Sequence, residues 1–149
     1  MFSQTVEYAL RAIVVLANAP ESPHTAQSIA EVAKLPVDYL FKVMQPLAKA
    51  GLVVAQRGKR GGFMLGRHPS KVTILDVVNA VDPIHRIQFC PLKLKSHGAR
   101  LCPLHRKLDS ALAMVERALS SSTLADVLEG GDPVRPLCEA GERIRVQIH

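Results

Sequence analysis

Two cysteines and two histidines lie close together in the second half of the chain, as Cys90, His97, Cys102 and His105. Thiolate and imidazole groups bind zinc and can share an iron–sulfur cluster. Cys102 and His105 also bracket the expected start of a helix, where free backbone N–H groups favour a thiolate or an anionic cluster. The spacing matches no common zinc motif. The residues alone therefore leave two readings open, a metal site and a metal-free thiol that is buried or reactive.

The rest of the chain offers no catalytic set. Cys138 lies far downstream and is not expected to be a ligand, and an odd number of cysteines, three, argues against a disulfide framework. The hydrolase pattern Gly-x-Ser-x-Gly, the zinc-protease pattern His-Glu-x-x-His and the glycine-rich nucleotide-binding patterns do not occur. An enzyme is the class that the sequence favours least.

Positive charge is concentrated in two stretches that contain no acidic residue. The formal net charge is +6, and residues 40–75 and 86–107 carry Lys and Arg but neither Asp nor Glu. Such patches suit an anionic polymer such as nucleic acid. On charge alone, a merely basic, soluble surface explains the pattern equally well.

No run of apolar residues approaches the roughly 20 that a membrane span requires. Met1 is followed by Phe2, Ser3 and Gln4, without the basic, apolar and cleavage regions of a signal peptide. We therefore expect a soluble, cytoplasmic protein with no membrane partner.

The first half of the chain reads as three helices followed by a hairpin. Apolar residues recur every three or four positions over 5–19, a second helix is expected between Thr25 and Pro36, and a third over about 37–50. Two short β-prone runs, 52–56 and 63–66, then flank a basic, glycine-rich turn. This order predicts a winged helix-turn-helix, in which the third helix enters the major groove of DNA.

The second half is expected to hold a helix that starts in a Thr73–Asp76 capping box, a cysteine-containing loop, and a longer helix from Leu104. An apolar stripe follows the longer helix for about four turns and is expected to pack against its twin in a second copy. The predicted class is mainly α with a small β-hairpin: a winged helix-turn-helix plus a long dimerisation helix. We expect four parts: a DNA-binding domain (1–82), a sensor loop (83–103), a dimerisation helix with a short terminal helix (104–129) and a flexible tail (130–149).

Candidate DNA-contacting residues follow from this arrangement. Polar and aromatic side chains on the third helix can reach base edges or phosphates, and the wing places three cations within six residues. Without the wing, a solvated charged helix face would be the better explanation. The candidates are Thr25 and Gln27 on the second helix, Asp38, Tyr39, Phe41, Lys42 and Gln45 on the third, and Arg57, Lys59 and Arg60 in the wing.

Five segments together resemble the Rrf2 family of bacterial transcription regulators. They are Glu7–Arg11, Tyr39–Val43, Arg57–Leu65, Ile74–Val78 and the cysteine loop. The resemblance extends to about Leu128 and implies a homodimer whose third helices and wings bind a palindromic operator in double-stranded DNA. It also implies an iron–sulfur cluster in the loop, as in several subfamilies.

The resemblance also suggests a ligand set for that cluster. Cys90 and Cys102 match the first and third cysteines of the family's cluster loop, His105 matches a ligand histidine, and Glu7 falls where an acidic residue of the opposite subunit completes the cluster. Ser96 stands where the middle cysteine is expected. This departure favours a [2Fe–2S] cluster over a [4Fe–4S] cluster and leaves a cluster-free dimer as an alternative.

The sequence therefore predicts a dimeric, DNA-binding transcription regulator, expected to be a repressor. Its iron–sulfur cluster would respond to redox state, nitric oxide or cluster supply. One alternative is a cluster-free regulator of the same family that senses through cysteine oxidation or a protein partner. Another is a zinc-stabilised interaction module that binds no specific DNA.

Overall fold

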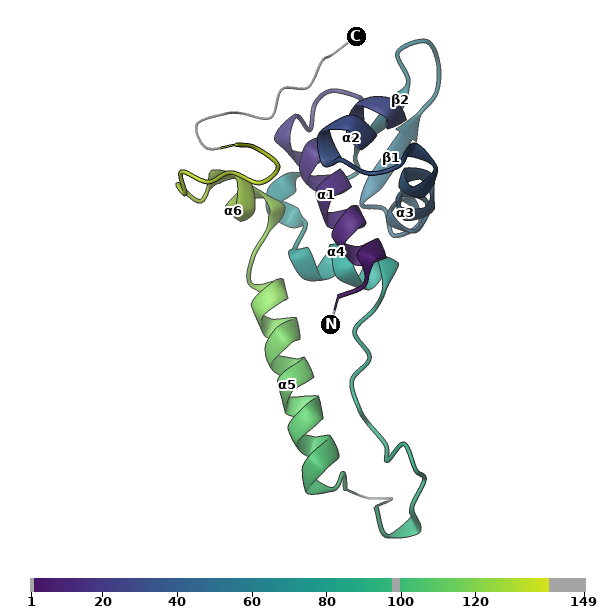
Figure 1. The fold of residues 1–149 in the computed structure, drawn as a ribbon, viewed down its shortest axis with the longest axis vertical. Coiled ribbons are helices and arrows are strands. Elements are labelled where there is room, and N and C mark those ends of the chain that lie inside the picture. Colours follow the sequence, from purple (N-terminus) through teal and green to yellow (C-terminus); the bar gives the residue numbers. More distant parts are fainter. Residues whose placement is uncertain (1, 98–99, 140–149) are drawn as a thin grey trace.

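The computed structural model describes residues 2–97 and 100–139. It divides into a head and an arm (Figure 1). The head contains α1 (Gln4–Asn18), α2 (Ala26–Ala33), α3 (Val37–Lys49), β1 (Val53–Gln56), β2 (Gly62–Leu65), η1 (Pro69–Lys71), α4 (Ile74–Val81) and α6 (Leu124–Glu129). The arm is residues 83–120, which comprise a long loop with the short η2 (Lys95–His97) and then α5 (Pro103–Ser120). The predicted fold class, mainly helical with one hairpin, is confirmed.

Helix α1 runs through the centre of the head and is buried along most of its length. Its N-cap is Ser3, whose hydroxyl accepts a hydrogen bond from the backbone N–H of Val6. Ile13, Val15 and Leu16 have no exposed surface, and they pack with the inner faces of α2 and α3. One hydrophobic core thus fixes the helix-turn-helix pair α2–α3 against α1.

The hairpin β1–β2 is antiparallel, with Val53 opposite Leu65 and Gln56 opposite Gly62. The segment before α2 pairs with it as well, because the backbone of His24 exchanges two hydrogen bonds with Phe63, 2.9 and 2.7 Å long. Gly62 lies at this crossing, where an added Cβ would come within 2.3 Å of the His24 carbonyl oxygen. The wing is therefore attached directly to the start of the helix-turn-helix.

The arm is connected to the head near the two ends of helix α4. This helix begins in the predicted capping box, in which Thr73 and Asp76 exchange hydrogen bonds of 2.9 and 3.0 Å. The chain leaves the head after Asp82, descends, and returns along α5 (Figure 1). On return, the Leu124 N–H donates to the Val72 carbonyl (2.9 Å), and Leu124 is fully buried in the core. The arm therefore leaves the head at one end of α4 and rejoins it beside the other.

Helix α5 has the predicted position, but none of its residues is buried in the single chain. Leu104, Leu108 and Met114 are 64%, 48% and 63% exposed. An amphipathic helix is stabilised mainly by burial of its apolar face. The exposed apolar face of α5 is therefore available to pack against another surface.

The segment after α6 was expected to be a flexible tail. Within its described part, Leu137 packs against the head's core and has a positive φ of 62°. Residues 140–149 lie outside the described residues. The flexibility of the tail stays a prediction.

Candidate nucleic-acid interface and sensor loop

The helix-turn-helix pair is joined by a tight turn at Lys34, whose φ of 52° is left-handed. Thr25 caps α2, its hydroxyl accepting from the Ser28 N–H at 3.1 Å. Gln27 lies exposed in the first turn of α2, and its amide donates to Glu31 at 3.3 Å. Both candidate residues on α2 therefore lie at its solvent-facing N-terminal end.

Helix α3 has a buried side and an open side. Leu40, Val43, Met44 and Leu47 fill the core, and no side chain caps the start of the helix. The open side carries four of the five candidates on this helix, all of them exposed: Asp38, Phe41, Lys42 and Gln45.

Tyr39, the fifth candidate on α3, is placed differently from the prediction. It is half-buried against α1, where its hydroxyl shares a 2.8 Å hydrogen bond with the Thr5 hydroxyl. Its ring meets the Tyr8 ring edge to face, with centroids 5.0 Å apart. Tyr39 therefore fixes α3 on α1, and the Lys42 ammonium lies 5.7 Å from its ring centroid.

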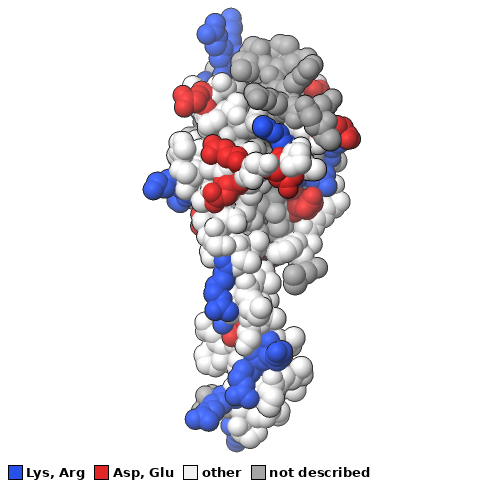
Figure 2. Space-filling model, turned by 90° about the vertical axis from the view of Figure 1, so that its left-hand side faces the viewer, with Lys and Arg blue, Asp and Glu red and all other residues white. Residues whose placement is uncertain are grey.

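The wing carries its cations on a short turn. Arg57, Lys59 and Arg60 are exposed, and the Gly61 N–H donates to the Gly58 carbonyl at 2.9 Å to close the turn. Figure 2 shows Lys and Arg side chains at the top of the molecule, the height of this turn in Figure 1, and again at the lower end of the arm. Most of the visible acidic side chains lie on the head between them. Within α3 (Val37–Lys49), Asp38 is the one acidic residue. Little negative charge on this helix therefore opposes a polyanion that approaches the cations of the wing.

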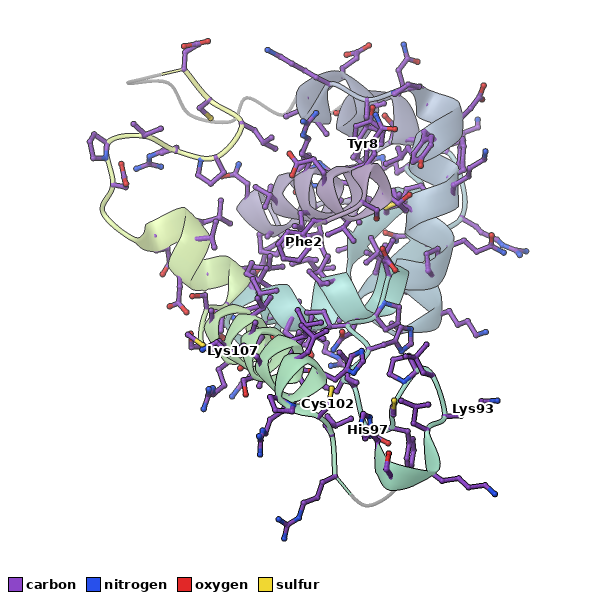
Figure 3. The ribbon with its side chains drawn as sticks, turned by 60° about the horizontal axis from the view of Figure 1, so that its bottom comes forward. Phe2, Tyr8, Lys93, His97, Cys102 and Lys107 are labelled. Carbon is purple, nitrogen blue, oxygen red and sulfur yellow. The ribbon has the colours of Figure 1, made fainter. Side chains whose placement is uncertain are left out.

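In the loop, each of the two cysteines has a histidine beside it. Cys90 is 6% exposed, and its Sγ lies 3.6 Å from His97 Nδ1. Cys102 is the N-cap of α5, and its Sγ lies 3.2 Å from His105 Nδ1. Figure 3 shows His97 and Cys102 at the loop and the start of α5, apart from Tyr8 on the head.

The structure does not bring the four predicted metal ligands together in one chain. Glu7 lies on α1 with its carboxylate 3.0 Å from Arg11 Nε. Within residues 2–97 and 100–139, no three His, Cys, Asp or Glu side chains gather closely enough to hold a metal ion. Cys138 lies away from the loop and lines a cavity together with Val32 and Lys34 at the end of α2. A complete ligand set would need a second chain or a rearrangement of the loop.

The loop is fastened to α5 by Arg86. Its guanidinium makes two 2.7 Å hydrogen bonds to the Asp109 carboxylate and one of 3.1 Å to Glu116. These bonds raise the pKa of Arg86 above its usual value and lower the pKa of Asp109, which also accepts from the Ile87 N–H at 2.9 Å. The sequence alone carries no signal of this clamp, because Arg86 and Asp109 are far apart in the chain and no motif joins them.

The comparisons with known proteins agree with this geometry. Residues 2–130 match the family model Rrf2, described as an iron-dependent transcriptional regulator. A protein of Aquifex aeolicus that carries the name HTH-type transcriptional regulator is 32% identical over 131 residues, 86% of this chain and 91% of that protein.

Solved structures give the same result. The IscR of T. potens superposes with a TM-score of 0.70 at 28% identity, over 89% of this chain and 88% of that one. CymR, the global cysteine regulator of B. subtilis, superposes with a TM-score of 0.73 at 30% identity, over 89% and 98%.

The family and these relatives are regulators and not enzymes, as predicted. In the described part of the chain, no helix is long and apolar enough to cross a bilayer. The model match over residues 2–130, the identity to the Aquifex protein and the winged helix-turn-helix lead to one conclusion: the chain belongs to the Rrf2 family of transcriptional regulators.

Proposed function

We propose that this regulator binds a palindromic operator in double-stranded DNA as a homodimer and acts as a repressor. The observation that carries the proposal is the open side of α3 beside a wing with three exposed cations, Arg57, Lys59 and Arg60. In this geometry a helix reads base edges in the major groove while the wing contacts phosphates. The candidate contacts are those named above on α2, α3 and the wing, and Tyr39 in addition holds α3 on α1.

The exposed apolar face of α5 supports the homodimer. Leu104 and Leu108 lie one helical turn apart on that face, and a second copy of the same helix offers a complementary surface. Two copies joined through their arms would place two α3 helices on successive half-sites, about 34 Å apart along the duplex.

We further propose that the loop senses a signal through an iron–sulfur cluster, [2Fe–2S] rather than [4Fe–4S]. Cys90, Cys102 and His105 would hold it, with Glu7 of the partner subunit as the remaining ligand. Support comes from the thiol–imidazole pairs and from the iron-dependent description of the family. When bound, the cluster supplies a centre that reacts with oxidants or nitric oxide.

A cluster-free regulator is the second candidate. It is favoured by the absence of a three-donor group among the described residues of one chain and by the likeness to the cysteine regulator CymR. Here oxidation of Cys90 or Cys102, or a protein partner, would change DNA affinity.

Purification without oxygen tests the two candidates directly. Iron and sulfide near two per chain, with visible absorbance, would support the cluster. Colourless, iron-free protein that still binds DNA after an attempted reconstitution would support the cluster-free regulator. Zinc with no preference among duplex sequences would contradict both and indicate an interaction module.

Cys90→Ala separates sensing from folding. Under the cluster proposal it lowers iron content and changes DNA affinity, while the helical circular dichroism signal stays close to that of wild type. Cys138→Ala is the matched control, and it should leave iron content and affinity unchanged. Unchanged affinity and sensing in Cys90→Ala would remove the loop from the switch.

A further inference from the structure

Phe41 is a large apolar side chain on the open side of α3, where Val37, one turn earlier, is also exposed and the other neighbours are polar. Phe41 is 52% exposed, and Asp38, Lys42 and Gln45 around it are polar and exposed. Within the head, the phenyl ring therefore gains little by burial. Its position is the part of α3 that faces DNA in the proposed function, on which this inference rests.

The phenyl ring of Phe41 is held in place by Phe63 on β2, the second strand of the wing. It meets the Phe63 ring at a centroid distance of 6.4 Å and an interplanar angle of 62°, an edge-to-face contact. Phe63 is itself fixed, because its N–H and carbonyl both bond to the backbone of His24. Phe41 is thus fixed in one position while its ring stays accessible to solvent. Such pre-organisation lowers the entropy cost of binding a ligand.

The chemistry of the ring limits what it can recognise in the major groove. A phenyl group neither donates nor accepts conventional hydrogen bonds, and the apolar group that a standard base pair shows there is the C5-methyl of thymine. Gln45 lies one turn further along the same side of α3, and its amide matches adenine N6 and N7. Both side chains favour A·T pairs.

We propose that Phe41 is a specificity-determining residue that packs on the C5-methyl group of one thymine in each operator half-site. Lys42, next to it, has the charge for a phosphate and adds affinity without adding sequence preference.

Selection from a pool of random duplexes, followed by replacement of single thymines with uracil, tests this proposal. Uracil lacks only the methyl group and keeps the base pair. At the contacted thymine we expect wild type to bind the uracil duplex about fourfold more weakly, the effect of one buried methyl-sized group. At other selected thymines the change should be small.

Two variants complete the test. In Phe41→Ala, the thymine and uracil duplexes should bind equally, and sites selected by this variant should lose the thymine at that position. Lys42→Ala is the control: it should weaken both duplexes and keep their ratio. Circular dichroism verifies that each variant is folded.

The outcomes distinguish this proposal from the one on which it rests. A wild-type protein that selects a sequence but ignores every uracil substitution overturns the role of Phe41 and leaves operator binding intact. The same holds if Phe41→Ala keeps the thymine preference. A wild-type protein that enriches no sequence overturns both proposals.

Discussion

Gly62 is a residue whose missing side chain allows the wing to pack against the start of the helix-turn-helix. A Cβ there would lie 2.3 Å from the His24 carbonyl oxygen, so backbone would have to move. We expect Gly62→Ala to lower the free energy of unfolding by about 1 to 3 kcal/mol.

Gly58→Ala is the control for that prediction. Gly58 has a φ of 113°, but nothing lies within 4 Å of the position of an added Cβ. Chemical denaturation of both variants separates the steric clash from the cost of the positive φ, because Gly58→Ala has only the second. An equal loss in the two variants would contradict the steric explanation.

Asp109 makes the attachment of the cysteine loop to α5 dependent on pH. The Arg86 hydrogen bonds and then the Ile87 N–H lower its pKa in the folded chain. Because the folded value is the lower one, this attachment is complete above the ordinary carboxyl pKa, about 3.9, and is lost as the pH falls through the folded value. Protection of the Ile87 amide from hydrogen exchange should fall in that acidic range.

Arg86→Ala tests the cause of this shift. The pKa of Asp109, followed by carboxyl carbon NMR, should rise toward its ordinary value. Asp126 is the internal control, because its pKa is lowered by the backbone N–H and the side chain of Thr123, not by an arginine. If the pKa of Asp109 stays low in Arg86→Ala, the clamp is not its cause.

At the scale of elements, the wing should supply affinity that does not depend on sequence. Lys59→Ala and Arg60→Ala each remove an exposed cation that we expect to contact a phosphate. We expect each to weaken binding to all duplexes alike and to reduce the slope of log affinity against log salt by about one.

Arg117→Ala, on α5 and outside both basic stretches, is the matched control for the wing. It removes a cation at the arm and should leave the slope unchanged. A wild-type slope in both wing variants would contradict the assignment of the hairpin as a wing.

The elements that local sequence determines were predicted correctly. The capping box at Thr73, the cap at Thr25 and the hairpin around its basic turn depend on residues a few positions apart. The contact of Tyr39 with Thr5 was not predicted, because the two residues are distant in sequence and helical spacing carries no information about it. The pairing of His97 with Cys90 depends in the same way on how the loop folds.

At the scale of the whole molecule, the arm should determine the oligomeric state. Leu108→Glu places a charge on the exposed apolar face of α5, and we expect it to shift dimers to monomers at micromolar concentration. Analytical ultracentrifugation measures the change. DNA affinity should fall with it, because each monomer reads only one half-site.

Arg117→Glu is the control on the same helix. At 100° per residue, position 117 lies on the opposite side of α5 from position 108, and Arg117 is exposed. This variant should remain dimeric. Dissociation of both variants to the same extent would point to lost helix stability and not to a dimer face.

The arm departs from one end of α4 and rejoins the head beside the other, where Ile74 and Ser122 share a 3.0 Å backbone hydrogen bond. In topology, the arm is an insertion whose two ends lie at the two ends of the short helix α4. The eight residues of α4 span about 12 Å, a gap that four or five extended residues can bridge. The length of the arm is thus independent of the head's architecture. A longer or shorter arm could change the distance between two heads without any change in α3 or the wing.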